Sequence, residues 1–258
     1  MPRRTIITVT TVIAIAAVSV FGQMSVTPTN DAPNPYETVA NYFKMPEGRT
    51  WGSTSAVDVD KDGKSIWVAE RCGANSCLNS NLDIVLKFDA SGKLLKSFGS
   101  GLMIFPHGMH VDRDGNVWVT DGQDNVPRRA PDAPPATPLP PQPAKLIGHQ
   151  VFKFSPDGKV LLTLGKPGGN PPGQPADPAS LYQPNDVITL ANGDVLVAEG
   201  HSNAPETSTR IVRFNRDGKY LGQFGKYGSG PGEFIQPHGL AMDAQGRLLV
   251  ADRSNNRV

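Results

Sequence analysis

The sequence of 258 residues lacks the features that mark several common classes of protein. Its 25 Lys and Arg residues nearly balance 24 Asp and Glu residues, and the formal net charge of +1 predicts no general attraction to nucleic acid or anionic lipid. There is no Gly-x-Ser-x-Gly motif, which excludes the nucleophile elbow of the α/β-hydrolases. The glycine-rich stretch 165–169 lacks both the Walker spacing and a following helix pattern, so it is not a phosphate-binding loop.

Long apolar runs are also absent, except at the N-terminus. The basic start, Met-Pro-Arg-Arg at residues 1–4, leads into an apolar stretch at 6–21. This order is typical of a signal peptide, and Val20 and Gly22 suit a cleavage site. We therefore predict a signal peptide at residues 1–22 and a protein exported to the periplasm or the extracellular space, with no stable membrane insertion after cleavage. A membrane anchor is the alternative, although the run is short for a spanning helix.

Cysteine is scarce, and Cys72 and Cys77 are the only residues of this type. They lie five positions apart in a loop that contains Gly and Asn, and an exported chain meets an oxidising compartment. We therefore expect a disulfide that pins this loop. Metal binding by the pair is the alternative, but the nearby sequence offers no second thiol or close histidine to complete a four-ligand set.

Two short apolar runs separated by a glycine turn form a pattern that recurs along the chain and ends each time on an acidic residue. The clearest copy runs from Phe105 to Asp121, and fainter or changed copies begin at Ser55, Gln183 and Gln236. The turn glycines of the four copies are Gly63, Gly115, Gly193 and Gly246. Glycine supplies the positive φ of a tight turn, so each copy predicts a hairpin of two antiparallel strands.

A second hairpin follows in the first three copies, with turns that end at Gly92, Gly158 and Gly218. Two hairpins give four antiparallel strands in each unit, and self-similar units with a period of about 40 residues are typical of a β-propeller. We therefore predict an all-β fold, a β-propeller of four-stranded blades. An ordinary β-sandwich with similar turns is the alternative, but the matched units disfavour it.

The spacing of these units predicts the domain organisation. Residues 23–47 are Pro- and Asn-rich and form a linker or a strap across the first blade. The predicted propeller covers residues 48–258, with blades at 48–99, 105–165, 183–225 and 236–258. The second blade carries an insert at 126–147 with eight prolines, which favours extended polyproline II and loops out of the sheet. This insert is interpreted as a passive surface segment or as a binding site for a Pro-recognising protein partner.

The fourth blade stops at Val258, within its expected third strand. Three and a half blades cannot close a ring, and an open propeller exposes apolar faces and strand edges. We therefore expect this sequence to be a fragment of a longer protein, with further blades and some functional groups after Val258.

Two histidines occupy the same position of the repeat. His107 and His238 each lie in a Pro-His-Gly sequence just ahead of the first strand of their blade. The innermost strands of a propeller line its central channel, so equivalent positions on different blades converge there. Two imidazoles at one axis favour a metal site, with Zn²⁺ the usual choice for neutral histidine ligands. The alternative interpretation of Pro-His-Gly is a simple turn.

Arginines follow the second strand in two of the blades, as Arg71 after Glu70 and Arg253 after Asp252. A guanidinium at each of these matched loop positions can bind a carboxylate bidentately near the metal. The predicted substrate is therefore a small molecule or peptide that carries a carboxylate. The alternative is that Arg253 and its polar neighbours only stabilise a blade corner.

Together these motifs resemble a known family. Pro-His-Gly and Ala-Asp-Arg at this spacing from the turn glycine resemble NHL repeats. Over about residues 55–258 the chain is more narrowly similar to the peptidyl-α-hydroxyglycine α-amidating lyases, through Arg71, His107, Gln183-Pro184, Asp186-Val187, Glu199-Gly200, Arg210-Ile211-Val212, Pro237-His238 and Ala251-Asp252-Arg253.

This resemblance implies a propeller with six blades in the full protein, a catalytic Zn²⁺ held by three histidines and a structural Ca²⁺ in the channel. Lyases of this family split a peptidyl-α-hydroxyglycine into a peptide amide and glyoxylate, so the resemblance implies an exported, zinc-dependent carbon–nitrogen lyase. By position, His107 and His238 match two zinc ligands, and the third histidine would follow Val258. The backbone carbonyls of Val57 and Met109 match calcium-binding positions.

The same resemblance assigns Arg71 and Arg253 to the substrate site. One catalytic position departs from the family, because His201 stands where the family has the tyrosine proposed as the base. Imidazole serves as a base at neutral pH and also binds metal, so both roles are open for His201. Two other functions are alternatives: a non-catalytic exported propeller that binds partners through its loops, and a calcium-dependent lactonase-type hydrolase. The all-oxygen metal site of such a hydrolase would not need paired imidazoles.

Overall fold

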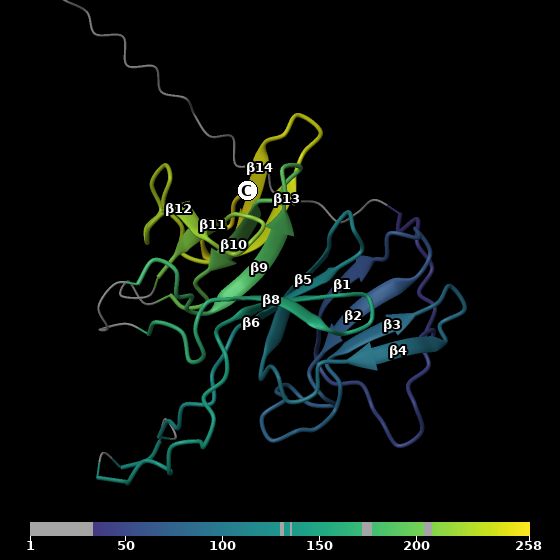
Figure 1. Ribbon diagram of the computed structural model, residues 1–258, viewed down its shortest axis with the longest axis horizontal. Coiled ribbons are helices and arrows are strands. Elements are labelled where there is room, and N and C mark those ends of the chain that lie inside the picture. The colour runs from purple at the N-terminus through teal and green to yellow at the C-terminus, as the bar shows by residue number, and fades with distance from the viewer. Residues whose placement is uncertain (1–32, 130–131, 135, 172–176, 204–207) are drawn as a thin grey trace, which may run out of the picture. The chain divides into compact units, whose positions relative to one another are not determined.

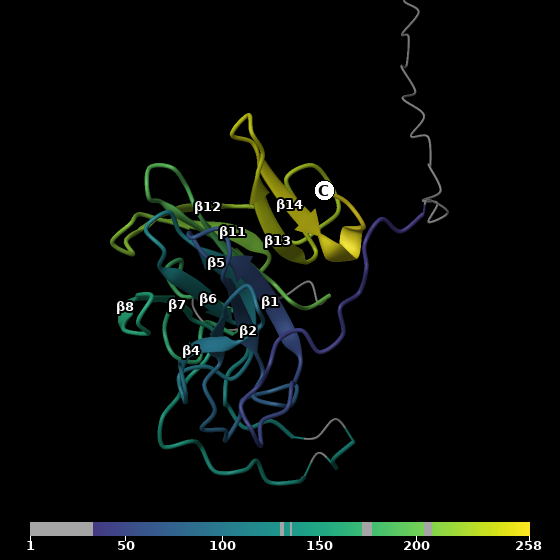
Figure 2. The same ribbon diagram turned by 90° about the vertical axis from the view of Figure 1, so that its right-hand side faces the viewer.

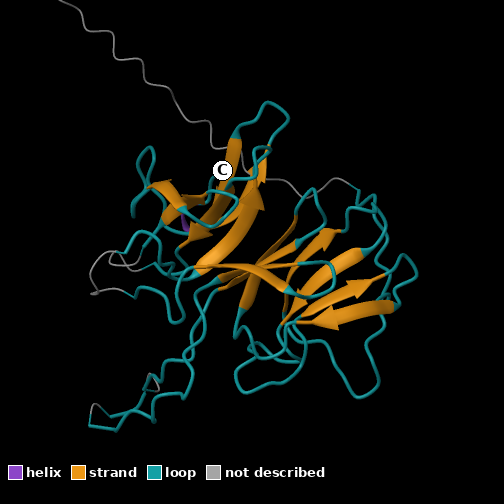
Figure 3. Cartoon of the chain, viewed as in Figure 1, coloured by secondary structure: helices purple, strands orange, loops and turns teal. Residues whose placement is uncertain are grey.

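The chain folds into antiparallel sheets that stack as the blades of a propeller (Figure 1). The computed structural model describes residues 33–129, 132–134, 136–171, 177–203 and 208–258. The expected signal peptide, residues 1–22, lies outside this part of the chain. Residues 33–40 carry no helix or strand, and the folded unit begins at Asn41. Figure 3 shows that strands and loops make up nearly all of the described chain.

Three sheets have four strands and the last sheet has two. The first contains β1 (Thr54–Val59), β2 (Ile66–Glu70), β3 (Val85–Phe88) and β4 (Leu94–Phe98). The second contains β5 (Pro106–Val111), β6 (Val117–Asp121), β7 (Val151–Phe154) and β8 (Val160–Leu164). The third contains β9 (Pro184–Thr189), β10 (Val195–Glu199), β11 (Arg210–Phe214) and β12 (Tyr220–Phe224). The last pairs β13 (Pro237–Met242) with β14 (Leu248–Asp252), and the short 3₁₀ helix η1 (Arg253–Asn255) follows.

Each strand pairs with its neighbour in sequence, so the strand order within every sheet is the chain order. This topology confirms the prediction of four-stranded propeller blades. The glycine turns also behave as predicted, as the first hairpin of the second blade illustrates. Gly115 has a φ of 88°, and its N–H donates to the carbonyl of Asp112. The Asp112 carboxylate then accepts the indole N–H of Trp118 at 3.1 Å, which ties the turn to the blade core.

The first strand of each blade lies innermost. Strand β1 contacts β5, β5 contacts β9, and β9 contacts β13. In Figure 1 the outer strands β4 and β12 lie at opposite edges of the folded unit, and Figure 2 shows the same blades from the side. Equivalent residues of the inner strands therefore face a common axis, which is what brings distant parts of the sequence to one site.

Apolar side chains fill the spaces between successive blades. Between the first two blades, the rings of Trp67 and Phe98 have centroids 5.6 Å apart, and Phe98 reaches Phe154 at 5.1 Å. The next two interfaces are filled by clusters that include Trp118, Leu181 and Phe214, and then Ile188, Ala198 and Ile211. Burial of such surface stabilises by about 25 cal/mol per Å². Since each cluster draws on two blades, packing fixes how the inner strands sit against one another.

The insert at 126–147 lies outside the sheets. None of its described residues belongs to a strand, and Figure 1 shows it extending away from the blades as a teal loop. Asp124 holds the start of the insert against the second blade, because its carboxylate contacts Arg128 at 2.8 Å and the buried ring of His149 at 2.9 Å. Residues 130–131 and 135 of the insert are not among the described residues.

The expected disulfide is confirmed. Cys72 and Cys77 are bonded, with their Cα atoms 5.1 Å apart. The chain from residue 41 to 47, the end of the expected strap, runs beside the first blade, because Lys44 forms a parallel bridge with Lys93. No helix in the part of the chain that the structure describes is long and apolar enough to cross a membrane.

Candidate metal centre

Three histidines meet at the axis of the propeller. His107 comes from β5, His238 from β13, and His201 from the loop after β10. One nitrogen atom of each ring lies within 4.8 Å of the corresponding atoms of the other two. The ring centroids are 4.7 Å apart for His107 and His238, and 5.0 and 5.2 Å from His201 to these two. We call these three residues the histidine cluster.

The protonation of these rings suits a metal. The Nδ1–H of His107 donates to the carbonyl of Asn185 at 2.8 Å, which leaves Nε2 as the atom with a free lone pair. Metal-binding histidines commonly carry such a hydrogen bond on the second ring nitrogen. The Nε2 atom of His238 is buried and has no hydrogen-bond partner among the described residues. A buried nitrogen without a partner costs free energy, and a bound cation would remove that cost.

Electrostatics keeps the cluster neutral at physiological pH. Burial and the neighbouring His238 lower the pKa of His107 to about 3. Burial, followed by the neighbouring His201 and Arg253, lowers the pKa of His238 to about 4. Burial and Arg253 also lower the pKa of His201. Neutral imidazole is the form that binds transition metals. The three residues therefore fit a site for Zn²⁺, which prefers a small number of nitrogen ligands.

The Pro-His-Gly sequence has a physical reason in the second blade. A Cβ atom added to Gly108 would lie 2.4 Å from the carbonyl oxygen of Asn185 on β9. Glycine therefore lets β9 approach closely enough for that carbonyl to accept the hydrogen bond from His107. The matching Gly239 has more room, since its nearest neighbour would be the Cβ of Ala251 at 3.7 Å.

Buried acidic residues hold the chain that leads into the inner strands. They end the second strand of every blade: Glu70, Asp121, Glu199 and Asp252. Asp121 accepts the N–H of Phe105 at 2.7 Å, two positions before His107, and Asp252 accepts the N–H of Gln236 at 3.0 Å, two positions before His238. Burial raises the pKa of Asp121 to about 7. These carboxylates therefore fix where the histidines emerge from the backbone.

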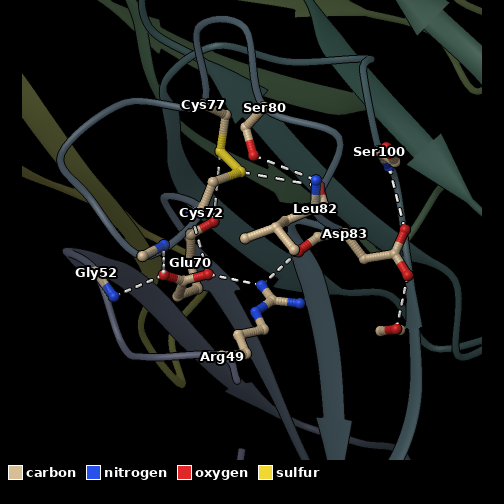
Figure 4. Close-up of polar contacts among 11 residues, drawn as sticks. Arg49, Gly52, Glu70, Cys72, Cys77, Ser80, Leu82, Asp83 and Ser100 are labelled. Atoms are coloured by element: carbon tan, nitrogen blue, oxygen red, sulfur yellow. Dashed lines mark hydrogen bonds and ion pairs between the residues drawn. A yellow bond between two sulfur atoms is a disulfide. The ribbon is translucent and has the colours of Figure 1, made fainter. Parts of the chain in front are cut away.

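Figure 4 shows the same arrangement in the first blade, next to the disulfide. Glu70 accepts the N–H groups of Gly52 at 2.7 Å and Gly73 at 2.6 Å, and it pairs with Arg49 at 2.7 Å. It also accepts the N–H of Cys72 at 3.0 Å. Glu70 therefore links the disulfide loop to the segment just before β1, and its role is structural.

The two arginines occupy different surroundings. Arg71 is buried, lies 3.3 Å above the ring of Phe105, and donates to Asn75 at 2.7 Å. Arg253 is exposed at the start of η1, and within the described chain its guanidinium makes no hydrogen bond. Arg253 lowers the pKa of His201 and His238, after burial, and Arg71 contributes to the lowered pKa of His107. Both cations therefore act on the histidine cluster.

The positions matched to calcium binding lie beside the cluster. A cavity of about 260 Å³ is lined by residues that include Val57, Met109, Asp186, His107 and His238. Burial and the nearby carboxylate of Asp58 raise the pKa of Asp186 to about 6. Asp186 was not among the predicted site residues, although it lies in the Gln-Pro-Asn-Asp segment of the repeat.

The structure brings together residues that the sequence had assigned to separate roles. His107 and His238 were expected to meet, whereas the third histidine was expected after Val258. His201, for which the roles of base and metal ligand were both open, lies with them, so three imidazoles meet in the described part of the chain. The expectation of a further histidine after Val258 stays a prediction. Asn185 was overlooked as a functional residue, although its position on β9 matches that of His107 on β5.

Comparisons with known proteins agree with the resemblance seen in the sequence. The NHL repeat family matches residues 234–258. The chain is 35% identical over 185 residues to the peptidyl-glycine alpha-amidating monooxygenase of Mus musculus, covering 68% of this chain and 16% of that protein. It is 28% identical over 215 residues to a probable peptidyl-alpha-hydroxyglycine alpha-amidating lyase of Caenorhabditis elegans, covering 82% of this chain and 49% of that protein.

Among solved structures, a catalytically inactive virginiamycin B lyase from Staphylococcus aureus matches with a TM-score of 0.49 at 16% identity, over 82% of this chain and 52% of that one. The chain thus spans half or less of the curated relatives named above. The resemblance to NHL-repeat proteins and to the amidating lyases is therefore confirmed as a resemblance.

Proposed function

We propose that this lyase-like NHL propeller is a zinc-dependent carbon–nitrogen lyase that splits a peptidyl-α-hydroxyglycine, or a similar carbinolamide, into an amide and glyoxylate. The observation that carries the proposal is the histidine cluster, in which three neutral imidazoles from two inner strands and one loop present nitrogen atoms within 4.8 Å of one another. The names of the relatives support the same reaction.

Zn²⁺ bound by the histidine cluster would supply a Lewis acid next to an oxygen atom of the substrate. The reaction itself is balanced without any further reagent. The hydroxyl group loses its proton, the C–N bond breaks as the C=O bond of glyoxylate forms, and the amide nitrogen gains a proton.

The arginines give this site a preference for a substrate that carries a carboxylate. Arg71 is preorganised, because its stacking on Phe105 and its hydrogen bond to Asn75 hold the guanidinium in place. Arg253 is exposed, and since its guanidinium has no hydrogen-bond partner among the described residues, it can bind a ligand oxygen. Fixed guanidinium groups bind carboxylates through paired, charge-assisted hydrogen bonds. They also favour the negative charge that develops when the hydroxyl proton leaves.

His201 has one of two roles in this proposal. Burial and Arg253 lower its pKa, so its ring is neutral at pH 7 and offers a lone pair to a metal or to a proton. If His201 is a ligand, His201→Ala loses zinc. If it is the base, the variant keeps zinc, loses turnover, and recovers part of it when imidazole is added.

The first experiment is elemental analysis of the purified protein beside His107→Ala, His201→Ala and His238→Ala, followed by an assay of glyoxylate release from a hydroxyglycine peptide. His110→Ala is the matched control, because His110 lies on the same strand as His107 and bonds Thr189 instead of joining the cluster. We expect about one zinc per chain in the wild type and the control, and its loss from His107→Ala and His238→Ala. A wild-type protein without zinc would refute the enzyme and favour a binding propeller.

We further propose that the protein is exported through its N-terminal segment and that a Ca²⁺ ion occupies the cavity beside Val57 and Met109. The disulfide supports an oxidising compartment. The raised pKa of Asp186 is the expected mark of a carboxyl group that a cation would compensate. Calcium titration followed by calorimetry, in wild type and Asp186→Asn, tests the ion. Equal heats in both proteins would exclude Asp186 as a ligand.

A further inference from the structure

Asn185 hydrogen-bonds to the ring of one histidine of the cluster and to the residues that directly precede the other two. Its carbonyl accepts the Nδ1–H of His107 at 2.8 Å. Its side-chain Nδ2 donates to the carbonyl of Gly200 at 2.6 Å and to the carbonyl of Pro237 at 3.0 Å. Gly200 and Pro237 directly precede the other two histidines of the cluster. One residue on β9 therefore links three segments that are far apart in the sequence.

The orientation of the Asn185 amide is fixed by these contacts. Asn185 is 0% exposed, and both of its Nδ2 partners are carbonyl oxygens, so a reversed amide would place an oxygen against two oxygens. Its own Oδ1 atom is buried without a partner in the described structure. A residue that served stability alone would not favour an unpartnered amide oxygen. We infer that the two hydrogen bonds donated by Nδ2 contribute more to the site than the missing hydrogen bond to Oδ1 costs.

The Asn185 carbonyl is also held in place from the second blade. The hydroxyl of Thr120 donates to it at 3.2 Å and accepts the N–H of Gly108 at 2.8 Å. Thr120 is fully buried, as is Asn185. The acceptor for His107 is therefore fixed on both sides of the interface between the second and third blades.

We propose that Asn185 is the positioning residue of the metal centre: it orients the ring of His107 through its carbonyl and sets the backbone in front of His201 and His238 through its amide. This inference rests on the proposed function, because the centre that it positions is the proposed zinc site. It assigns no direct contact between Asn185 and the metal or the substrate. Second-layer residues of this kind typically change metal affinity by about 10- to 100-fold.

The test compares Asn185→Ala and Asn185→Asp with the wild type. Alanine removes both donated hydrogen bonds, and aspartate keeps the size of the side chain while replacing the Nδ2 donor by an oxygen. We expect zinc affinity, measured by competition with a chelator, to fall about 10- to 100-fold in both variants. With Co²⁺ as the probe, we expect altered visible absorption bands, since these report ligand geometry.

Val187→Ala is the matched control. Val187 lies two positions along the same strand, is 0% exposed, and packs in the core between the second and third blades. Its truncation loosens β9 without touching the amide network. We expect unchanged zinc affinity and an unchanged Co²⁺ spectrum in this control. An equal loss of affinity in Val187→Ala would reduce Asn185 to a general stabiliser of the strand and overturn the proposal.

A second arm needs neither metal nor a variant that folds. In the metal-free wild type, the ring nitrogen chemical shifts of His107 should report a proton fixed on Nδ1, because that proton is held by Asn185. A proton on Nε2 would overturn the proposal.

The two arms separate this inference from the proposed function. A wild type that binds zinc through the histidine cluster, with unchanged affinity in both Asn185 variants, refutes the positioning role and leaves the enzyme proposal standing. A wild type without zinc refutes the metal centre and with it the positioning role. Loss of affinity in both variants, with the control intact, supports both.

Discussion

Gly108→Ala tests whether the metal site requires the close approach of the second and third blades at this residue. Gly108 follows His107 on β5, and it does not have a positive φ, so alanine is compatible with its backbone conformation. The added Cβ would lie 2.4 Å from the carbonyl oxygen of Asn185 and 2.6 Å from Oδ1 of Asp186. Ordinary contacts of a carbon atom are about 3.5 Å or longer. Strands β5 and β9 must therefore separate by roughly 1 Å.

The size of the effect follows from that overlap. Overpacking a tight interior costs about 1–3 kcal/mol, which for a chain of this size lowers the melting temperature by roughly 2–12 °C. The separation also lengthens the 2.8 Å hydrogen bond from His107 to Asn185. We therefore expect zinc affinity to fall by about 10-fold or more, as it does when the hydrogen bond behind a metal-binding histidine is lost.

The control is Gly239→Ala, at the same position of the last sheet. There the new Cβ would meet only the Cβ of Ala251 at 3.7 Å, an ordinary contact. Its only expected effect is a gain of about 0.4–1 kcal/mol from the less flexible unfolded chain. Urea unfolding and zinc competition on both variants decide the matter. If the two unfold at the same urea concentration and bind zinc equally, the interpretation of Pro-His-Gly as a packing requirement is wrong.

Three further predictions concern other parts of the molecule. Replacing Cys72 and Cys77 by serine should lower the free energy of unfolding by about 2 kcal/mol, because the small loop they close gains freedom in the unfolded chain, and urea unfolding measures this. Asp186 has its pKa raised from 3.8 to about 6, so its contribution to stability is complete below pH 3.8 and is lost as pH rises through 6. The stability of Asp186→Asn relative to wild type, followed by unfolding between pH 4 and pH 8, should therefore increase with pH, and a flat difference would contradict this. Replacing residues 126–147 by a short Gly-Ser linker should leave zinc content unchanged, since no described residue of the insert belongs to the histidine cluster.

Much of the fold was predictable because the turns carry their own signal. Glycines such as Gly63, Gly115 and Gly193 all take positive φ values at the hairpin turns, as the repeated spacing requires. Local chemistry of this kind depends on a few neighbouring residues and is visible in one sequence. The meeting of His107 with His238 was predictable for the same reason, because the repeat itself defines equivalent positions on inner strands.

His201 could not be assigned in the same way. It lies in a loop, and its place depends on Gly200 at a φ of 115° and on the side chain of Gln183, which accepts the N–H of His201 at 3.2 Å. No repeat spacing encodes these contacts. The resemblance to known lyases matched this position to a base, and the chemistry of imidazole left a metal-binding role open as well. Asn185 was not predicted for a different reason. Its backbone carbonyl accepts the hydrogen bond from His107, and every residue type has such a carbonyl, so the sequence does not indicate this contact.

The origin of the histidine cluster in three separate blades has an energetic consequence. The blades are held together by apolar clusters between them, and among the described strands none pairs with a strand of another blade. A metal bound by His107, His201 and His238 would join the second, third and last sheets at the axis. Because ligand binding to the folded state alone adds its free energy to stability, zinc should stabilise the packing between blades more than the strands within them. The close contact between Gly108 on β5 and Asn185 on β9 would then contribute both to metal binding and to the packing of the second blade against the third.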